Sequence, residues 1–175
     1  MNITELLLHP VRLRIVHAVL DGLPFTTSQL RARLPDISPA TLYRQVALLA
    51  DGGLVEVERE ERVRGAVERS YRLHPARTAL DLDTIAAMST DDHRRGFAAA
   101  MAALVAEFSA YLGREGADPL ADSVSYRQFA LWLSDAEKAE FVAEMVSIIR
   151  ARMDHGPDPE RRRHLLSTIL FPTNP

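Results

Sequence analysis

One predicted helix, at residues 38–51, carries a polar face with side chains that could bind a phosphate or a base edge. At about 100° per residue, Leu42, Val46 and Leu49 fall on one side of it and should be buried. The opposite side and its flanks carry Ala40, Thr41, Tyr43, Arg44 and Ala47. Small side chains let a helix backbone approach a groove closely, and the Arg44 guanidinium can reach a guanine edge or a phosphate.

A second candidate contact lies at the tip of a predicted hairpin. Residues 54–59 and 67–73 alternate apolar and polar side chains as strands do, and the segment 62–65 joins them. Arg62 and Arg64 in this tip could follow a phosphate backbone. An ordinary solvated hairpin is the alternative, because four nearby glutamates would repel phosphate. They are Glu58, Glu60, Glu61 and Glu68.

These residues need helices and turns that hold them in place. Residues 2–20 are expected to be mostly helical, and a second helix is expected to begin at Thr26 or Thr27, where Thr26 and Gln29 match a capping box. Ser38 is a favourable N-cap with Pro39 at the first helical position, and glycines follow Asp51. Helix, turn, helix and hairpin together predict a winged helix-turn-helix over residues 1–75. Such modules place the second helix in the DNA major groove.

A long helix is predicted in the second half, residues 76–175. A short helix over 78–88 comes first, and Ser89 then begins the long helix at 90–113. Large apolar residues line one stripe of it, and alanines fill its flanks. The stripe is Phe97, Met101, Leu104, Phe108 and Tyr111 or Leu112. A dimerisation helix is the preferred interpretation, and a helix packed on its own domain is the alternative.

The end of the chain predicts a strand, a helix and a second strand. The strands are residues 124–133 and 164–171, and Ser134 with Glu137 caps the helix between them. This order predicts a βαβ unit over 124–171 with parallel strands. A two-stranded sheet is marginal alone, so it should pair with a second copy or be covered by the long helix. The expected fold class is therefore α+β, mainly helical, with a DNA-binding domain at 1–75 and a dimerisation and effector domain at 76–175.

Several aromatic and apolar residues of the second half could line a pocket for a small apolar effector. They are Tyr126, Phe129, Trp132, Phe141, Met145 and Phe171. The alternative is that they form an ordinary core.

Composition limits the remaining possibilities. The 175 residues include no cysteine, which excludes disulfides, cysteine-based metal sites and cysteine nucleophiles. No apolar run is long enough to span a membrane and the first residues do not form a signal peptide, so a cytoplasmic protein is expected. The net charge is −3, but residues 1–75 carry ten arginines against nine acidic residues. A local basic patch can still bind phosphates.

The first 75 residues resemble the ArsR-like branch of bacterial winged-helix repressors, and the related PadR and MarR groups. The resemblance rests on HPVRLRIV at 9–16, ISPATLYRQVALLADGGLVE at 37–56 and YRL at 71–73. It implies a dimeric transcription factor, usually a repressor, that binds a double-stranded DNA operator. It also implies groove-reading positions at Ser38, Thr41, Tyr43, Arg44 and Gln45. Of these, Tyr43 and Arg44 are expected to contact bases or phosphates, and Ser38 and Thr41 to contact phosphates.

The chain departs from the best-known ArsR-type metal sensors, because it lacks the cysteines of their metal sites. Histidine and carboxylate sites, such as His155 with Asp154 and Asp158 or His9 with His17, do not have a recognised ligand spacing. We therefore expect no metal and no cofactor.

Two other classes of function were weighed. The sequence contains no G-x-S-x-G, no Walker loop, no G-x-G-x-x-G after a strand and no H-E-x-x-H, so an enzyme is not expected. A winged helix that binds proteins instead of DNA is the stronger alternative, because the net charge is negative and the predicted hairpin is rich in glutamate. Strongly salt-dependent DNA binding that requires Arg44 would distinguish the two.

Overall fold

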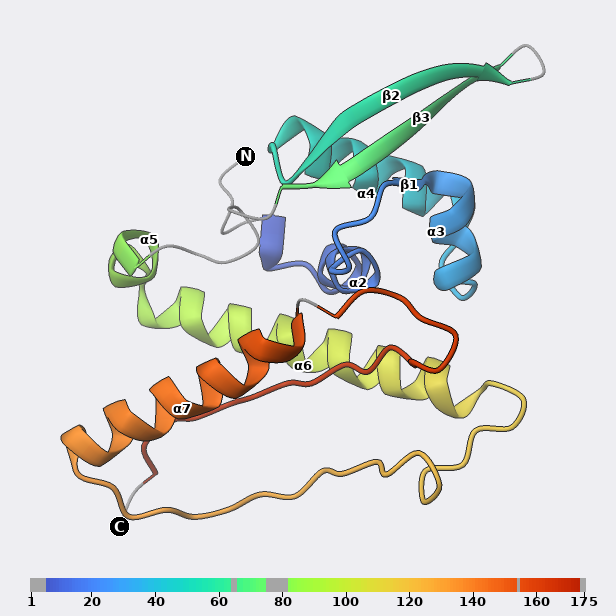
Figure 1. Ribbon diagram of the computed structural model, residues 1–175. Helices are drawn as coiled ribbons and strands as arrows, with labels where there is room; N and C mark the ends of the chain where they lie inside the picture. The colour runs from blue at the N-terminus through green and yellow to red at the C-terminus, as the bar shows by residue number, and fades with distance from the viewer. Residues whose placement is uncertain (1–5, 64–65, 75–81, 154, 174–175) are drawn as a thin grey trace. The chain divides into compact units, whose positions relative to one another are not determined.

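The computed structural model describes residues 6–63, 66–74, 82–153 and 155–173. The chain divides into two compact units, Met1–Asp122 and Ser123–Pro175, and each is described by itself (Figure 1). The described residues contain six helices and one three-stranded antiparallel sheet, an α+β arrangement. Arg64 and Gly65, in the predicted hairpin tip, lie outside the described residues.

The first unit begins with the predicted helix-turn-helix and hairpin. Its helices are α2 (Pro10–Ala18), α3 (Thr27–Arg33) and α4 (Pro39–Asp51), and its strands are β1 (Phe25–Thr26), β2 (Val55–Val63) and β3 (Ala66–Leu73). The sheet order is β1-β3-β2, with Phe25 opposite Tyr71 and Val55 opposite Leu73. Sequence reasoning missed β1, whose two residues are too few to show a strand period.

The helix starts predicted at Thr26, Ser38 and Ser89 are confirmed, because capping depends on residues that are close in sequence. The starts predicted near residues 2 and 78 lie outside the described residues. The backbone N–H of Gln29 donates to Thr26 Oγ1 at 3.2 Å, and the Gln29 side chain accepts from the Thr26 N–H at 2.9 Å. Ser38 caps α4 and Ser89 caps α6 (Thr90–Leu112). After α4, Gly53 has the left-handed φ of 71° that glycine adopts without strain.

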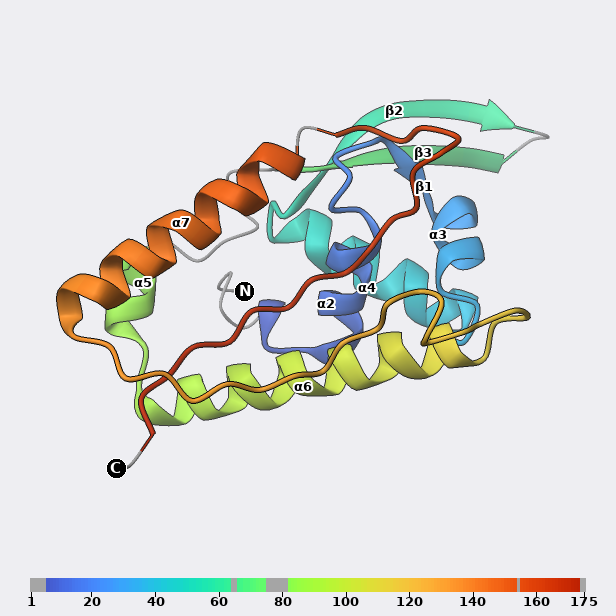
Figure 2. The ribbon, with the colours of Figure 1, turned by 60° about the horizontal axis from the view of Figure 1, so that its bottom comes forward.

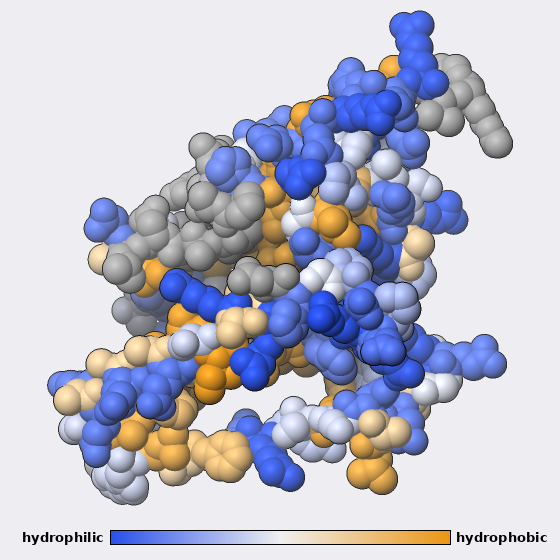
Figure 3. Space-filling view, viewed as in Figure 1, coloured by the Kyte–Doolittle hydropathy of each residue, from blue (hydrophilic) through white to orange (hydrophobic). Residues whose placement is uncertain are grey.

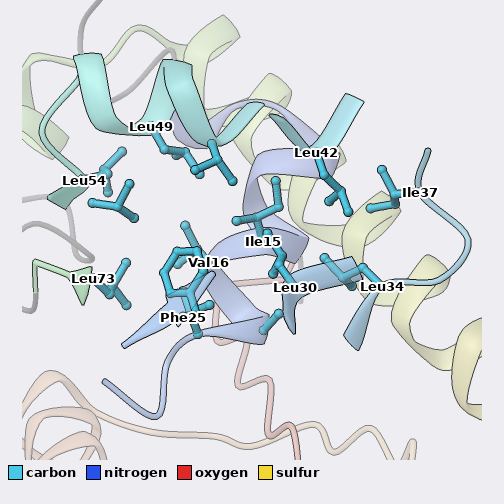
Figure 4. Packing of buried hydrophobic residues seen from close by; sticks show 14 of the residues in the cluster. Ile15, Val16, Phe25, Leu30, Leu34, Ile37, Leu42, Leu49, Leu54 and Leu73 are labelled. Atoms are coloured by element: carbon cyan, nitrogen blue, oxygen red, sulfur yellow. The ribbon is translucent and has the colours of Figure 1, made fainter. Parts of the chain in front are cut away.

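A single apolar core holds the helix-turn-helix to the sheet (Figure 4). Leu42 and Leu49 of α4 point into it, as do Ile15 of α2 and Phe25 of β1. Leu54 and Leu73 close the sheet side, where β2 and β3 begin and end. The buried face predicted for residues 38–51 is therefore confirmed.

The β2–β3 hairpin leaves the core soon after it begins. The register shifts between Val57 and Arg59, and from there on both strands are exposed, apart from the tip residues 63–66 whose side chains are not described. Figure 3 shows hydrophilic residues over this hairpin, at the upper right. Polar side chains can cover such an arm on both faces because nothing packs against it.

The long helix α6 forms as predicted and packs on α2 (Figure 2). Its buried residues are the small ones, Ala99 and Ala103, and a side chain at Gly96 would come within 3.1 Å of Leu8. Of the predicted stripe of large apolar residues, Phe97, Phe108 and Leu112 are exposed, whereas Met101, Leu104 and Tyr111 are partly buried. Val105, outside the predicted stripe, is exposed as well. The fully buried part of the helix is thus made by alanines.

The second unit contains α7 (Asp135–Met153), which confirms the helix predicted after Ser134. The two strands predicted beside it are wrong: residues 124–133 and 164–171 form neither helix nor strand. A strand needs a partner for its backbone N–H and C=O groups, and these two segments do not pair with each other. The predicted βαβ unit is therefore not present in this chain.

Two further predictions concern the segment between β3 and α6 and the boundary at residue 75. The helix expected over 78–88 appears as α5 (Leu82–Ala87), and residues 75–81 lie outside the described residues. The compact unit that contains the winged helix extends to Asp122 and includes α6. The division into a DNA-binding domain at 1–75 and a dimerisation and effector domain at 76–175 stays a prediction.

Candidate nucleic-acid interface

The start of α4 is held by local hydrogen bonds and exposed to solvent. Ser38 accepts a hydrogen bond from the Thr41 N–H at 3.3 Å and donates its hydroxyl to Thr41 Oγ1 at 2.9 Å. Ser38, Pro39 and Ala40 are exposed, and Thr41 is half-buried. The two hydroxyls predicted to meet phosphates therefore lie together at the N-terminus of a helix, where N–H groups favour an anion.

The exposed face of α4 combines small residues with one arginine and one tyrosine. Ala40, Arg44 and Ala47 are exposed, and the Tyr43 side chain is 61% exposed. Within the described residues, Arg44 makes no ion pair with a carboxylate. Its guanidinium is therefore available to a ligand, and the fully buried Leu42 and Leu49 fix the helix behind it.

Gln45 does not lie on this face. It is only 4% exposed, and its Oε1 accepts a hydrogen bond of 3.2 Å from Arg12 of α2. Arg12 is itself buried and also donates to the carbonyl of Leu6 at 2.6 Å. Gln45 holds α4 against α2 from behind, so we leave it out of the proposed contact set.

A small cleft between α3 and α4 adds residues that the sequence analysis did not single out. Its volume is about 100 Å³, and it is lined by Thr27, Ser28, Arg31, Pro39, Leu42 and Tyr43. Ser28 and Arg31 are exposed, and Arg31 makes no ion pair among the described residues. A hydroxyl and a guanidinium beside Tyr43 can bind one phosphate group. The signal was present in the sequence as an arginine one turn after Ser28 on a helix with no acidic residue.

The arginines in the stem of the hairpin are already paired. Arg72 donates to Glu58 from Nε at 2.8 Å, Arg69 donates to Glu60 at 2.7 Å, and Arg59 pairs with Glu61. Arg62, next to the tip, is exposed and makes no ion pair within the described residues. The three stem arginines are thus neutralised by glutamates, whereas Arg62 has no carboxylate partner among the described residues.

His9, at the N-cap of α2, lies close enough to Arg44 to feel its charge. Burial, followed by the positive charges of Arg12 and Arg44, holds the pKa of His9 below its ordinary value. The neutral form of His9 is therefore favoured beside Arg44.

A larger hollow of about 610 Å³ lies between α4 and the hairpin, and Ala47 of the exposed α4 face is part of its lining. Its lining includes three carboxylates, Asp51, Glu56 and Glu60, together with Arg69 and His74. Arg69 is paired with Glu60, so the hollow has a net negative lining that disfavours phosphate.

The residues predicted to line an effector pocket are mostly at the surface of the second unit. Tyr126 and Phe129 are exposed, Trp132 is 88% exposed, and Phe141 and Met145 of α7 are partly exposed. Phe171, which was predicted to join them, is 61% exposed. Among the described residues, no three His, Asp or Glu side chains gather as metal ligands would. None of the described helices is long and apolar enough to cross a membrane.

Comparison with known proteins finds a match over part of the first unit. Residues 7–58 match the family model of a helix-turn-helix domain. The match covers α2, α3, α4 and the beginning of β2, and it supports DNA-binding regulation as the role of the chain. No curated protein matches the sequence.

Proposed function

We propose that this chain is a sequence-specific transcriptional regulator that binds double-stranded DNA by inserting α4 into the major groove. The observation that carries the proposal is the exposed face of α4 within a matched helix-turn-helix domain. On that face Arg44 is available, small residues surround it, and Ser28 and Arg31 of α3 extend the polar surface. Arginine reads guanine through two parallel hydrogen bonds, which is the commonest specific contact in the major groove.

Each residue has a stated part in this proposal. Arg44 and Tyr43 contact bases or phosphates, while Ser38 and Thr41 bind phosphate at the start of α4. Arg31 joins them from α3, and Arg62 and Arg64 follow the backbone from the hairpin tip. Phosphate contacts fix the register of the helix in the groove, and base contacts carry the sequence specificity.

The proposal includes a homodimer that acts as a repressor. Repression rests on the resemblance to ArsR-like, PadR and MarR regulators. The dimer is supported by the exposed apolar stripe of α6 and by the length of this helix, 23 residues or about 34 Å at 1.5 Å per residue. A two-fold dimer that reads two half-sites needs its recognition helices about 34 Å apart.

The proposal also includes a small apolar effector bound in the second unit. The exposed aromatic side chains of Tyr126, Phe129 and Trp132 support it, because monomeric proteins rarely leave so much apolar surface uncovered. A thermal-shift screen of small apolar compounds tests this part. Ligands that raise the melting temperature of the wild type but not of Trp132→Ala support it, and a screen in which nothing raises the melting temperature contradicts it.

The experiment that tests DNA binding is a pull-down of sheared genomic DNA, followed by sequencing and a salt titration on the most enriched site. Wild type should enrich a near-palindromic site, and Arg44→Ala should not. Arg95→Ala is the matched control, because Arg95 is also exposed but lies on α6 and pairs with Asp92. If wild type enriches no DNA at low salt, or if Arg44→Ala enriches the same site equally well, the proposal is wrong.

A further inference from the structure

Arg14 of α2 lies where three parts of the first unit meet. Its side chain is only 5% exposed, yet it carries a permanent positive charge. Nη1 and Nη2 donate to the two carboxylate oxygens of Asp36 at 2.6 and 2.9 Å. Nε donates to Glu107 Oε1 of α6 at 3.0 Å. One guanidinium thus joins the turn of the helix-turn-helix to the long helix.

The geometry makes this a stiff connection. A guanidinium is planar and its donors are fixed relative to one another, so a carboxylate on one edge cannot move without displacing the other. Burial makes an unpaired arginine costly, so both partners are held close to it. The Arg14 guanidinium in turn holds the pKa of Asp36 below its ordinary value, as expected for a carboxylate in a strong bidentate pair.

The two ends of the connection matter for different reasons. Asp36 stands two residues before Ser38, the N-cap of α4, and the adjacent Ile37 N–H donates to the Leu34 carbonyl at 3.2 Å. The position of Asp36 therefore sets where α4 begins and how its first turn is oriented. Glu107 belongs to α6, which contacts α2 and buries the small side chains of Ala99 and Ala103.

We propose that Arg14 is the positioning residue through which the placement of α6 sets the pose of the recognition helix α4. The proposal rests on the proposed function, because it assigns the link between the helix that would join two copies and the helix that would read DNA. Any event that moves α6, such as dimer formation or effector binding, then changes the presentation of Arg44 through the Glu107–Arg14–Asp36 chain of contacts. The proposed function assigns no DNA contact to Glu107, Arg14 or Asp36.

Amide hydrogen exchange on the full chain tests the link without DNA. Glu107→Ala should speed exchange over residues 34–42 by about fivefold or more, the lower end of typical coupling between sites. Glu107→Gln, which keeps an acceptor for Arg14 Nε, should restore most of the protection. Arg94→Ala is the matched control, because it breaks an exposed ion pair with Asp91 on the same helix.

The amides of β2 provide an internal reference. If Glu107→Ala speeds exchange in β2 and in residues 34–42 by the same factor, the variant only loosens the fold and the inference is wrong. It is also wrong if exchange over 34–42 stays at the wild-type rate. Neither outcome depends on DNA, so failure of the link is distinguishable from failure of the proposed function in the genomic pull-down. On an enriched site, Glu107→Ala should weaken binding several-fold while Arg94→Ala leaves it unchanged.

Discussion

Arg44 and Gln45 are neighbours in the sequence and face opposite environments. Arg44 is exposed on α4, whereas Gln45 is buried and accepts a hydrogen bond from Arg12. Arg44→Ala should therefore lower specific DNA affinity by about 1–3 kcal/mol and leave the melting temperature unchanged. Gln45→Ala should instead destabilise the fold by about 1–3 kcal/mol, because it removes an acceptor from a buried charged donor. Thermal unfolding and DNA titration of both variants check this, and a stable Gln45→Ala protein with reduced sequence specificity would contradict the assignment.

Asp36 makes a contribution to the free energy of unfolding that depends on pH. Its pKa in the folded state is lowered, chiefly by the hydrogen bonds from Arg14, so the folded state favours the charged form. The stabilisation is fully present above the unfolded pKa of about 3.9 and is lost as the pH falls through the lower, folded value. Asp36→Asn cannot titrate. The difference in unfolding free energy between wild type and Asp36→Asn should be constant from about pH 5 to 7 and shrink below about pH 4.

Denaturant unfolding at several pH values measures this difference. Asp135→Asn is a comparison variant: the pKa of Asp135 is also lowered, by Lys138, but that pair is exposed and screened by solvent, so its difference should be smaller than that of Asp36→Asn. A difference for Asp36→Asn that grows as the pH falls would contradict the assignment.

The residues that sequence reasoning missed are buried arginines. An arginine on a helix is expected to be solvated, and no residue close to Arg12 or Arg14 in the sequence indicates its side-chain partner. Their side-chain acceptors include Gln45, Asp36 and Glu107, which lie between 22 and 93 positions away. Such pairs are set by tertiary packing, so a local pattern could not reveal them. The apolar face of α4, in contrast, follows from residues within a few turns of one another.

At the scale of elements, the hairpin should contribute to DNA binding only through its tip. Arg62→Ala should lower the salt dependence of operator binding, reducing the slope of log K against log salt by about 1, because one phosphate contact is lost. The double variant Glu60→Gln/Arg69→Gln removes a preformed ion pair in the stem without changing the net charge. Its slope should equal that of the wild type. Equal slopes for Arg62→Ala and wild type would show that the hairpin is an ordinary solvated arm.

Whether an element was predictable depended on where its hydrogen bonds are made. Helices α3, α4, α6 and α7 satisfy their backbone within one segment, and Thr26, Ser38, Ser89 and Ser134 mark their starts. Strands β2 and β3 were also found, because a short turn brings them together. Residues 124–133 and 164–171 show a strand pattern, but no strand within the described part of the chain pairs with them. The side chains of these two segments are suited to a sheet, but the pattern cannot specify which strand would pair with them.

At the scale of the molecule, the two faces of α6 have different uses. The small residues Ala99 and Ala103 pack on α2, while Phe97, Val105, Phe108 and Leu112 remain exposed. A helix with apolar residues at positions 97, 101, 105, 108 and 112 presents the three- and four-residue spacing that pairs helices. The homodimer proposed above would bury this stripe in each copy.

Phe108→Glu tests this interface, because it places one charge from each copy in the proposed apolar contact. We expect sedimentation equilibrium to show a dimer for wild type and a monomer for Phe108→Glu, since an unpaired buried charge costs several kcal/mol. Ala102→Glu is the matched control, exposed on the same helix but about 120° away from Phe108. Phe108 also stacks on Tyr111, so Val105→Glu serves as a second variant that leaves the ring contact in place. The monomeric variants should bind a single half-site as the wild type does and lose the gain in affinity from a second half-site one turn away. If both variants remain dimeric, α6 is not the contact between copies.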